Sequence, residues 1–98
     1  MIYVIATVTL KPGTVDAFAA AAAPCLIGTR QEEGNISYDL HRREGEPDTV
    51  VFVERWESRE HLKSHFSAPH MLVYREATKD MVADRKIEVI EPAKVDNL

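Results

Sequence analysis

Cysteine is almost absent from this sequence, in which Cys25 is the only thiol. A single cysteine cannot close an intramolecular disulfide, which suits a reducing cytoplasm, and it cannot supply the ligands of an iron–sulfur cluster. The sequence also lacks a glycine-rich phosphate loop, a dinucleotide fingerprint and a serine nucleophile elbow. We therefore expect a cytoplasmic protein that holds no nucleotide, flavin or iron–sulfur cluster.

Excess basic charge and long apolar runs are also missing. Twelve Lys and Arg against 16 Asp and Glu give a net charge of -4, and the basic residues are scattered. This distribution argues against a nucleic-acid partner, because binding to phosphates requires a basic stripe or patch. The opening stretch MIYVIATVTL is apolar but has no basic leader, and it is about half as long as a helix that spans a bilayer. No membrane partner or targeting segment is expected.

The hydrophobic pattern of the 98 residues predicts one domain that alternates strands and helices. A strand at 1–10 is followed by a helix that begins near Val15 and ends at Gly34, with a kink or a junction of two helices at Pro24. The later elements are strands at 36–41 and 49–56, a helix capped by Ser58, a second helical segment that begins at Pro69, a strand at 85–92 and a polar tail at 93–98. The second helical segment is expected to bury His70, Val73, Tyr74, Ala77 and Met81.

The order βαββαβ predicts a ferredoxin-like α+β domain over residues 1–92, with a four-stranded antiparallel sheet and both helical regions on one face. In that topology the first and third strands are central. Both are apolar on both faces, so helices on one side would leave an apolar patch on the other. A second copy of the chain would cover this patch, which predicts a homodimer in the form of an α+β barrel.

The homodimer has a direct test. Sedimentation equilibrium at micromolar concentration should give twice the mass of the chain, because exposing the open face of the sheet is unfavourable. A stable monomer at that concentration would contradict the prediction.

Three of the four histidines lie close together, at His61, His65 and His70. His61 and His65 are four residues apart, a spacing that can chelate zinc, but no third ligand stands at a suitable spacing, so no metal is expected. His65 and His70 fall on the apolar stripe of their helices and should point inward. They are either partly buried histidines that serve packing alone or proton-transfer groups in a pocket.

Strand 49–56 offers side chains that could complete such a pocket. Glu54 and Trp56 project from the same side of this strand, and a carboxylate near a histidine fixes its tautomer, while an indole gives a flat wall for an aromatic ring. Tyr38 and Tyr74 could add hydroxyl groups. Core packing or a surface ion pair would explain each of these residues equally well when taken alone.

Several motifs closely resemble the antibiotic biosynthesis monooxygenase (ABM) family, especially its small quinol-monooxygenase-like members. The matching stretches are EEGNISYDL and VERWESREHLKSHFSAPHM, which place Gly34 four residues before Tyr38 and combine Glu54-x-Trp56-x-Ser58 with Leu62-x-x-His65 and His70. The resemblance implies a dimeric α+β barrel that oxidises small phenolic or quinol compounds with O2 and without a cofactor.

The resemblance also implies roles for individual residues. We expect His65 to act as general base, Glu54 to orient it and Trp56 to support the substrate ring, all as catalytic residues. The expected substrate-binding residues are His70, Tyr38, Tyr74 and Phe66. The partners would be a small aromatic or quinol-like substrate, O2 and a second copy of the chain.

Two other functions stay open. The family also contains an isomerase of a phosphorylated sugar of the autoinducer-2 type, and an anion site made by His61, Arg75 or Lys79 would favour that activity. The second alternative is a dimeric module that binds a small molecule without catalysis.

Overall fold

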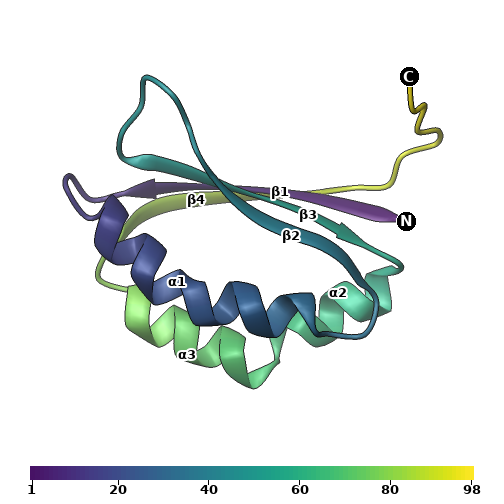
Figure 1. The fold of residues 1–98 in the computed structure, drawn as a ribbon, viewed down its shortest axis with the longest axis horizontal. Helices are drawn as coiled ribbons and strands as arrows, with labels where there is room; N and C mark the ends of the chain where they lie inside the picture. The colour runs from purple at the N-terminus through teal and green to yellow at the C-terminus, as the bar shows by residue number, and fades with distance from the viewer.

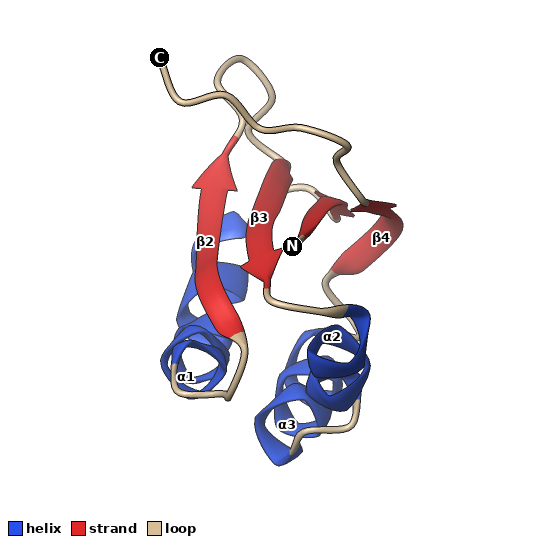
Figure 2. Ribbon diagram, turned by 90° about the vertical axis from the view of Figure 1, so that its right-hand side faces the viewer, coloured by secondary structure: helices blue, strands red, loops and turns tan.

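The computed structural model describes residues 1–98 and contains the expected order of elements (Figure 1). The elements are β1 (Ile2–Leu10), α1 (Val15–Arg30), β2 (Asn35–Arg42), β3 (Thr49–Trp56), α2 (Arg59–Phe66), α3 (Pro69–Thr78) and β4 (Val82–Ile90). The strands form one antiparallel sheet in the order β2-β3-β1-β4, and the helices all lie on one of its faces (Figures 1 and 2). The ferredoxin-like α+β prediction is confirmed. None of the helices combines the length and the hydrophobicity that crossing a bilayer requires.

The two central strands fix which side chains face the helices. Along β1 and β3, residues that face the helices are buried, whereas those on the other face are mostly half-buried. The register pairs Val4 with Glu54 and Ala6 with Phe52, so these side chains share the helix-covered face. Trp56 lies on the same face and is completely buried. The prediction that Glu54 and Trp56 project from one side of the strand is confirmed, and the structure shows that this side faces the helices.

Helix α1 is continuous through Pro24, so the alternative of two helices that meet at this proline is wrong. The spacing of its apolar residues predicts a face that contains Phe18, Ala22, Cys25 and Thr29, and all four are buried. The helix ends at Arg30, four residues before the predicted end. Gly34 lies instead in the turn before β2, with φ of +83°, and a Cβ atom there would lie 2.2 Å from the ring of His61.

Helices α2 and α3 begin with the signals that the sequence contains. The Ser58 hydroxyl accepts a hydrogen bond from the backbone N–H of His61 and caps α2. Pro69 occupies the first turn of α3, where its missing N–H removes no helical hydrogen bond. The chain therefore breaks between the two helices at 67–68, and each helix packs on the sheet in its own orientation.

The face that α3 buries differs from the prediction. The buried residues are Met71, Tyr74 and Thr78, whereas Val73 is 66% exposed and Ala77 is also exposed. Apolar residues surround the start of this helix, so the hydrophobic pattern allows two neighbouring faces. Contact with α1 selects between them, because the sulfur atom of Met71 lies 3.5 Å from that of Cys25.

The open face of the sheet is apolar only along its centre. Tyr3, Ile5 and Val53 are half-buried there, while the neighbouring strands present polar groups such as Asp39 and Lys86. Strand β4 begins three residues earlier than predicted and ends two residues earlier. The C-terminal tail lies on this open side (Figure 1). Pro92, Lys94 and Val95 of the tail border a hollow beside Tyr3. The homodimer stays a prediction.

Pro24 gives a prediction about stability. It lies exposed inside α1, where it cannot donate to the carbonyl of residue 20. We expect Pro24→Ala to raise the free energy of unfolding by about 1–3 kcal/mol, measured by urea denaturation. Pro12→Ala, in the turn after β1, is the matched control and should not stabilise the protein. An unchanged or lower midpoint for Pro24→Ala would contradict the prediction.

Candidate active site

A cavity of about 260 Å³ lies between the sheet and the second half of the helical layer. This volume is just below the range of sites for drug-sized ligands, so it suits a small molecule. Nine of the thirteen lining residues are hydrophobic, so the walls of the cavity are mostly apolar. The lining consists of Val4, Ala6, Val8, Tyr38, Phe52, Glu54, His65, Phe66, Met71, Tyr74, Arg75, Arg85 and Ile87.

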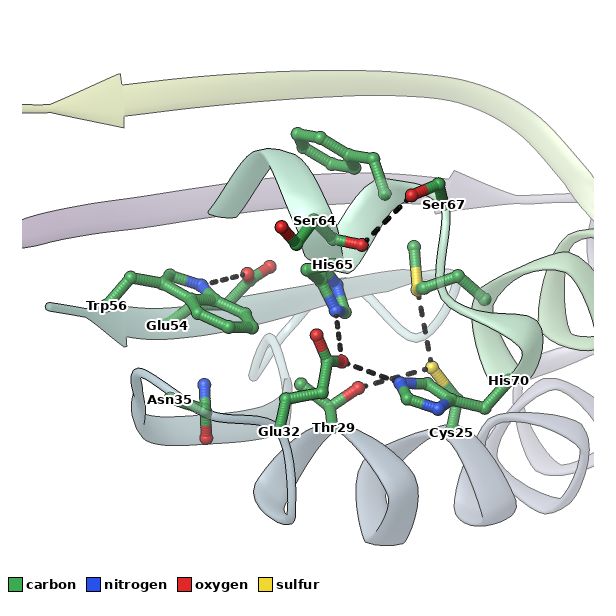
Figure 3. Close-up of polar contacts among 12 residues, drawn as sticks. Cys25, Thr29, Glu32, Asn35, Glu54, Trp56, Ser64, His65, Ser67 and His70 are labelled. Atoms are coloured by element: carbon green, nitrogen blue, oxygen red, sulfur yellow. Dashed lines mark hydrogen bonds and ion pairs between the residues drawn. The ribbon is translucent and has the colours of Figure 1, made fainter. Parts of the chain in front are cut away.

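His65 lines this cavity from the last turn of α2, and only 1% of the residue is exposed. Its Nδ1 atom lies 2.7 Å from Oε2 of Glu32 (Figure 3). Its Nε2 atom has no hydrogen-bond partner in the protein. Since every fully buried polar side-chain atom has a partner, Nε2 must reach open space, and the cavity is the open space that His65 borders. The prediction that His65 points inward is confirmed.

Glu32 determines the protonation of this imidazole. A carboxylate oxygen accepts hydrogen bonds, so Nδ1 carries the proton and Nε2 of the neutral ring presents its lone pair to the cavity. Burial lowers the pKa of His65, and the hydrogen bond and negative charge of Glu32 oppose that effect. At neutral pH, His65 is therefore an unprotonated base whose basic atom faces the cavity.

His70 donates to the same carboxylate. Its Nε2 atom lies 2.6 Å from Oε2 of Glu32, so one oxygen atom accepts hydrogen bonds from two histidines (Figure 3). The ring lies against α1 at Gly28, where an added Cβ would lie 2.8 Å from its Cγ atom. His70 is not among the residues that line the cavity, so the expected direct contact with substrate is not found. It holds Glu32 in place instead.

Glu54 lines the cavity but does not orient His65, so that part of the prediction is wrong. Its Oε1 atom accepts a hydrogen bond of 2.9 Å from the indole N–H of Trp56. Burial raises the pKa of Glu54 to about 7; the Trp56 bond lowers it, and the charge of Glu32 raises it further. Near neutral pH, this carboxyl is a mixture of protonated and ionised forms, so it can give or take a proton.

Trp56 does not line the cavity, which corrects its expected role as a platform for the substrate ring. The indole is completely buried, and its ring centroid lies 4.8 Å from that of His65. It therefore packs against the imidazole and binds Glu54, and both contacts restrict the side chains that do reach the cavity.

The other expected binding residues all line the cavity. Tyr38 and Tyr74 are buried, and Phe66 at the end of α2 is 38% exposed. Burial raises the pKa of Tyr38 far above its usual range and that of Tyr74 to about 12. Both phenols stay protonated, so they form walls and can donate hydrogen bonds but cannot act as bases.

Glu32 is the residue that the sequence analysis missed. It lies beyond the end of α1, in a polar stretch that is typical of a surface turn. One signal was present: Cys25, Thr29 and Glu32 follow the spacing i, i+4, i+7 and so extend the buried face of the helix. The turn keeps Glu32 on that face, where its side chain is only 15% exposed.

Glu32, His65 and His70 are also the kind of group that could hold a metal ion, since their ligand atoms lie within 4.8 Å of one another. A histidine bound to a metal usually donates its other ring N–H to an acceptor. Neither Nε2 of His65 nor Nδ1 of His70 has an acceptor in the protein. The arrangement therefore fits hydrogen bonding better than metal binding. His61 takes no part, because its Nδ1 atom pairs with the Ser58 hydroxyl at 2.7 Å.

Comparison with known proteins identifies a family and individual relatives that this chain resembles. The model of the family described as Antibiotic biosynthesis monooxygenase matches residues 1–77. Escherichia coli YgiN, named a probable quinol monooxygenase, is 32% identical over 94% of this chain and 98% of its own length. Rv0793 from Mycobacterium tuberculosis is 33% identical over 95% of this chain and 90% of its own length.

Solved structures agree with the sequence comparison. The structure of Rv0793 superposes with a TM-score of 0.87 at 29% identity and covers 98% of both chains. A protein from Nitrosomonas europaea superposes with a TM-score of 0.90, covering 96% of this chain and 100% of its own, at 23% identity. The second likeness shows a shared fold.

The raised pKa of Glu54 predicts how stability depends on pH. The unfolded chain releases this proton near the ordinary pKa of 4.5, whereas the folded chain keeps it until about 7. The folded state therefore loses stability relative to the unfolded state as the pH rises between these values. Glu54→Gln removes this loss, so its stability relative to wild type should increase by roughly 3 kcal/mol between pH 4 and pH 8, measured by urea denaturation. Glu57→Gln, an exposed neighbour, should show no such trend, and a trend of the same size in both variants would contradict the assignment.

Proposed function

This chain belongs to the antibiotic biosynthesis monooxygenase family, and we propose that it oxidises a small quinol or phenol with O2, without a metal or prosthetic group. The observation that carries the proposal is the unpaired Nε2 atom of His65, which faces a cavity with aromatic walls while Glu32 holds the other ring nitrogen. This arrangement provides a base beside a space of the size and polarity of a small aromatic ring.

The proposed reaction balances without an external reductant. A quinol and O2 give a hydroxyquinone and water: one ring C–H bond is replaced by a C–O bond, the O–O bond breaks, and the substrate supplies all four electrons. An ionised quinol is electron-rich enough to transfer an electron to O2. The protein therefore has to remove a proton, hold the ring and exclude water.

His65 takes the phenolic proton at Nε2 in this scheme. Glu32 stabilises the imidazolium that results, because its carboxylate already accepts the Nδ1 hydrogen bond. The quinolate passes an electron to O2, and the two radicals combine at a ring carbon to give a peroxide. Loss of the proton on that carbon then drives cleavage of the O–O bond.

Glu54 is suited to protonate the oxygen that departs as water. It lines the same cavity as His65, and burial keeps much of it protonated near neutral pH. The Trp56 bond occupies Oε1, so the proton is available on Oε2. His65 and Glu54 would then act as base and acid on one substrate.

An isomerase of a phosphorylated hydroxyketone is the second candidate, because Arg75 lines the cavity. The other residues that would have formed an anion site lie elsewhere, since His61 binds Ser58 and Lys79 pairs with Glu76. The mostly apolar lining fits an aromatic ring better than a sugar phosphate, so oxidation is the function we favour.

The role of His65 predicts a large loss of activity. In a series of hydroquinones, O2 uptake measured with an oxygen electrode should fall about 100- to 10,000-fold in His65→Ala, because general-base catalysis typically contributes that factor. Glu32→Gln keeps the shape of the carboxylate but removes its charge. It should reduce the rate and lower the pKa seen in the pH profile.

His41→Ala is the matched control. His41 is exposed near the end of β2, on the open face of the sheet, and does not line the cavity, so its removal should leave the rate unchanged. Circular dichroism and thermal melting would show that all variants fold. Equal O2 uptake by wild type and His65→Ala, or no uptake by wild type with any quinol, would contradict the proposed function.

A further inference from the structure

Two arginines at the cavity have no acidic partner. Of the seven arginines, four lie within 4 Å of a carboxylate, which leaves Arg55, Arg75 and Arg85. Arg55 lies on the open face of the sheet and donates to the Ser37 hydroxyl. The remaining two both line the cavity. Because acidic residues outnumber basic ones in this chain, a shortage of carboxylates does not explain the unpaired charges.

The two guanidinium groups approach the cavity from different walls. Arg75 comes from α3, next to Tyr74, and donates to the backbone carbonyl of Phe66. Arg85 comes from β4, opposite Val8 in the sheet register, and forms no hydrogen bond or ion pair within the protein. Arg85 is exposed and Arg75 is half-buried, so their charges lie on the solvent side of the cavity.

No carboxylate in the cavity neutralises this pair. Glu54 is the only acidic residue of the lining; it is 5% exposed and already accepts a hydrogen bond from Trp56. The lining also contains no Lys, Ser, Thr or Gly, the residues that usually complete a phosphate site. Guanidinium groups have a planar fork of donors that matches the geometry of a carboxylate.

We propose that the natural ligand is an aromatic acid whose ring lies in the apolar part of the cavity beside His65 and whose carboxylate binds Arg75 and Arg85. This inference rests on the proposed function for the reaction, but the binding of the acid group is independent of catalysis. It narrows the substrate from any small quinol to a ring that carries one negative charge.

Binding of a ligand that cannot be oxidised tests the inference by itself. We would use 2,5-dimethoxybenzoate and its methyl ester, which share the ring and differ in charge, and measure both by calorimetry. Wild type should bind the acid at least about tenfold more tightly than the ester, because hydrogen bonds between charged groups are stronger than those to a neutral ester. Arg85→Gln should lose about tenfold in affinity for the acid and keep its affinity for the ester.

Arg55→Gln is the control, since it removes the same charge from the chain without touching the cavity. It should bind both ligands as wild type does. Equal affinity of wild type for acid and ester would overturn the inference, as would tighter binding of the matching aryl phosphate than of the acid. The comparison of acid and ester in wild type needs no variant, so a variant that fails to fold does not affect it.

A parallel assay separates this inference from the proposed function. O2 uptake would be measured with 2,5-dihydroxybenzoate and with its methyl ester. Tight binding of the acid without any O2 uptake would refute the oxidation and leave the acid site standing. Equal kcat/KM for acid and ester, with equal affinities, would refute the acid site and leave the oxidation standing.

Discussion

A single carboxylate oxygen, Oε2 of Glu32, organises the site. It lies at hydrogen-bond distance from Nδ1 of His65 and Nε2 of His70, and thereby joins the turn after α1 to both later helices. Without an acceptor, the Nδ1–H of a buried imidazole would be unpaired, and either ring nitrogen of His65 could face the cavity. The half-buried carboxylate in turn accepts both of its hydrogen bonds from these two N–H groups. The geometry of the candidate site and the tertiary packing therefore depend on the same three side chains.

The break between α2 and α3 makes this convergence possible. On an uninterrupted helix, two residues five positions apart would point in directions about 140° apart, so one carboxylate oxygen could not contact both. Pro69 restarts the chain as a separate helix, and His65 and His70 then meet at Glu32 (Figure 3). The break in the helical pattern at Pro69 thus brings the two imidazoles together.

The sheet and its two faces could be predicted from the sequence, because side chains along a strand alternate between the faces every second residue, and this pattern is visible locally. Glu54 and Trp56 were correctly placed on the same side of their strand for that reason, and the structure shows that the helices cover this side. Their partners could not be derived, since which side chain meets which across the cavity depends on tertiary packing. Glu32 stands in a polar turn and carried only the faint signal of a continued helical stripe. The face of α3 was wrong because Met71 and Val73 are equally apolar, and only the contact with Cys25 distinguishes them.

Gly28 shows how closely the site limits change elsewhere. A glycine inside a helix is usually an obvious target for stabilisation, since alanine there commonly adds about 0.5–1 kcal/mol. Here the His70 imidazole occupies the space that the methyl group of an alanine would fill. Gly28→Ala, made to gain heat resistance, would push the His70 ring away from α1 and loosen the Glu32 carboxylate that this ring supports. The sizes of residues 28 and 70 are therefore coupled, so that neither can change without a compensating change in the other.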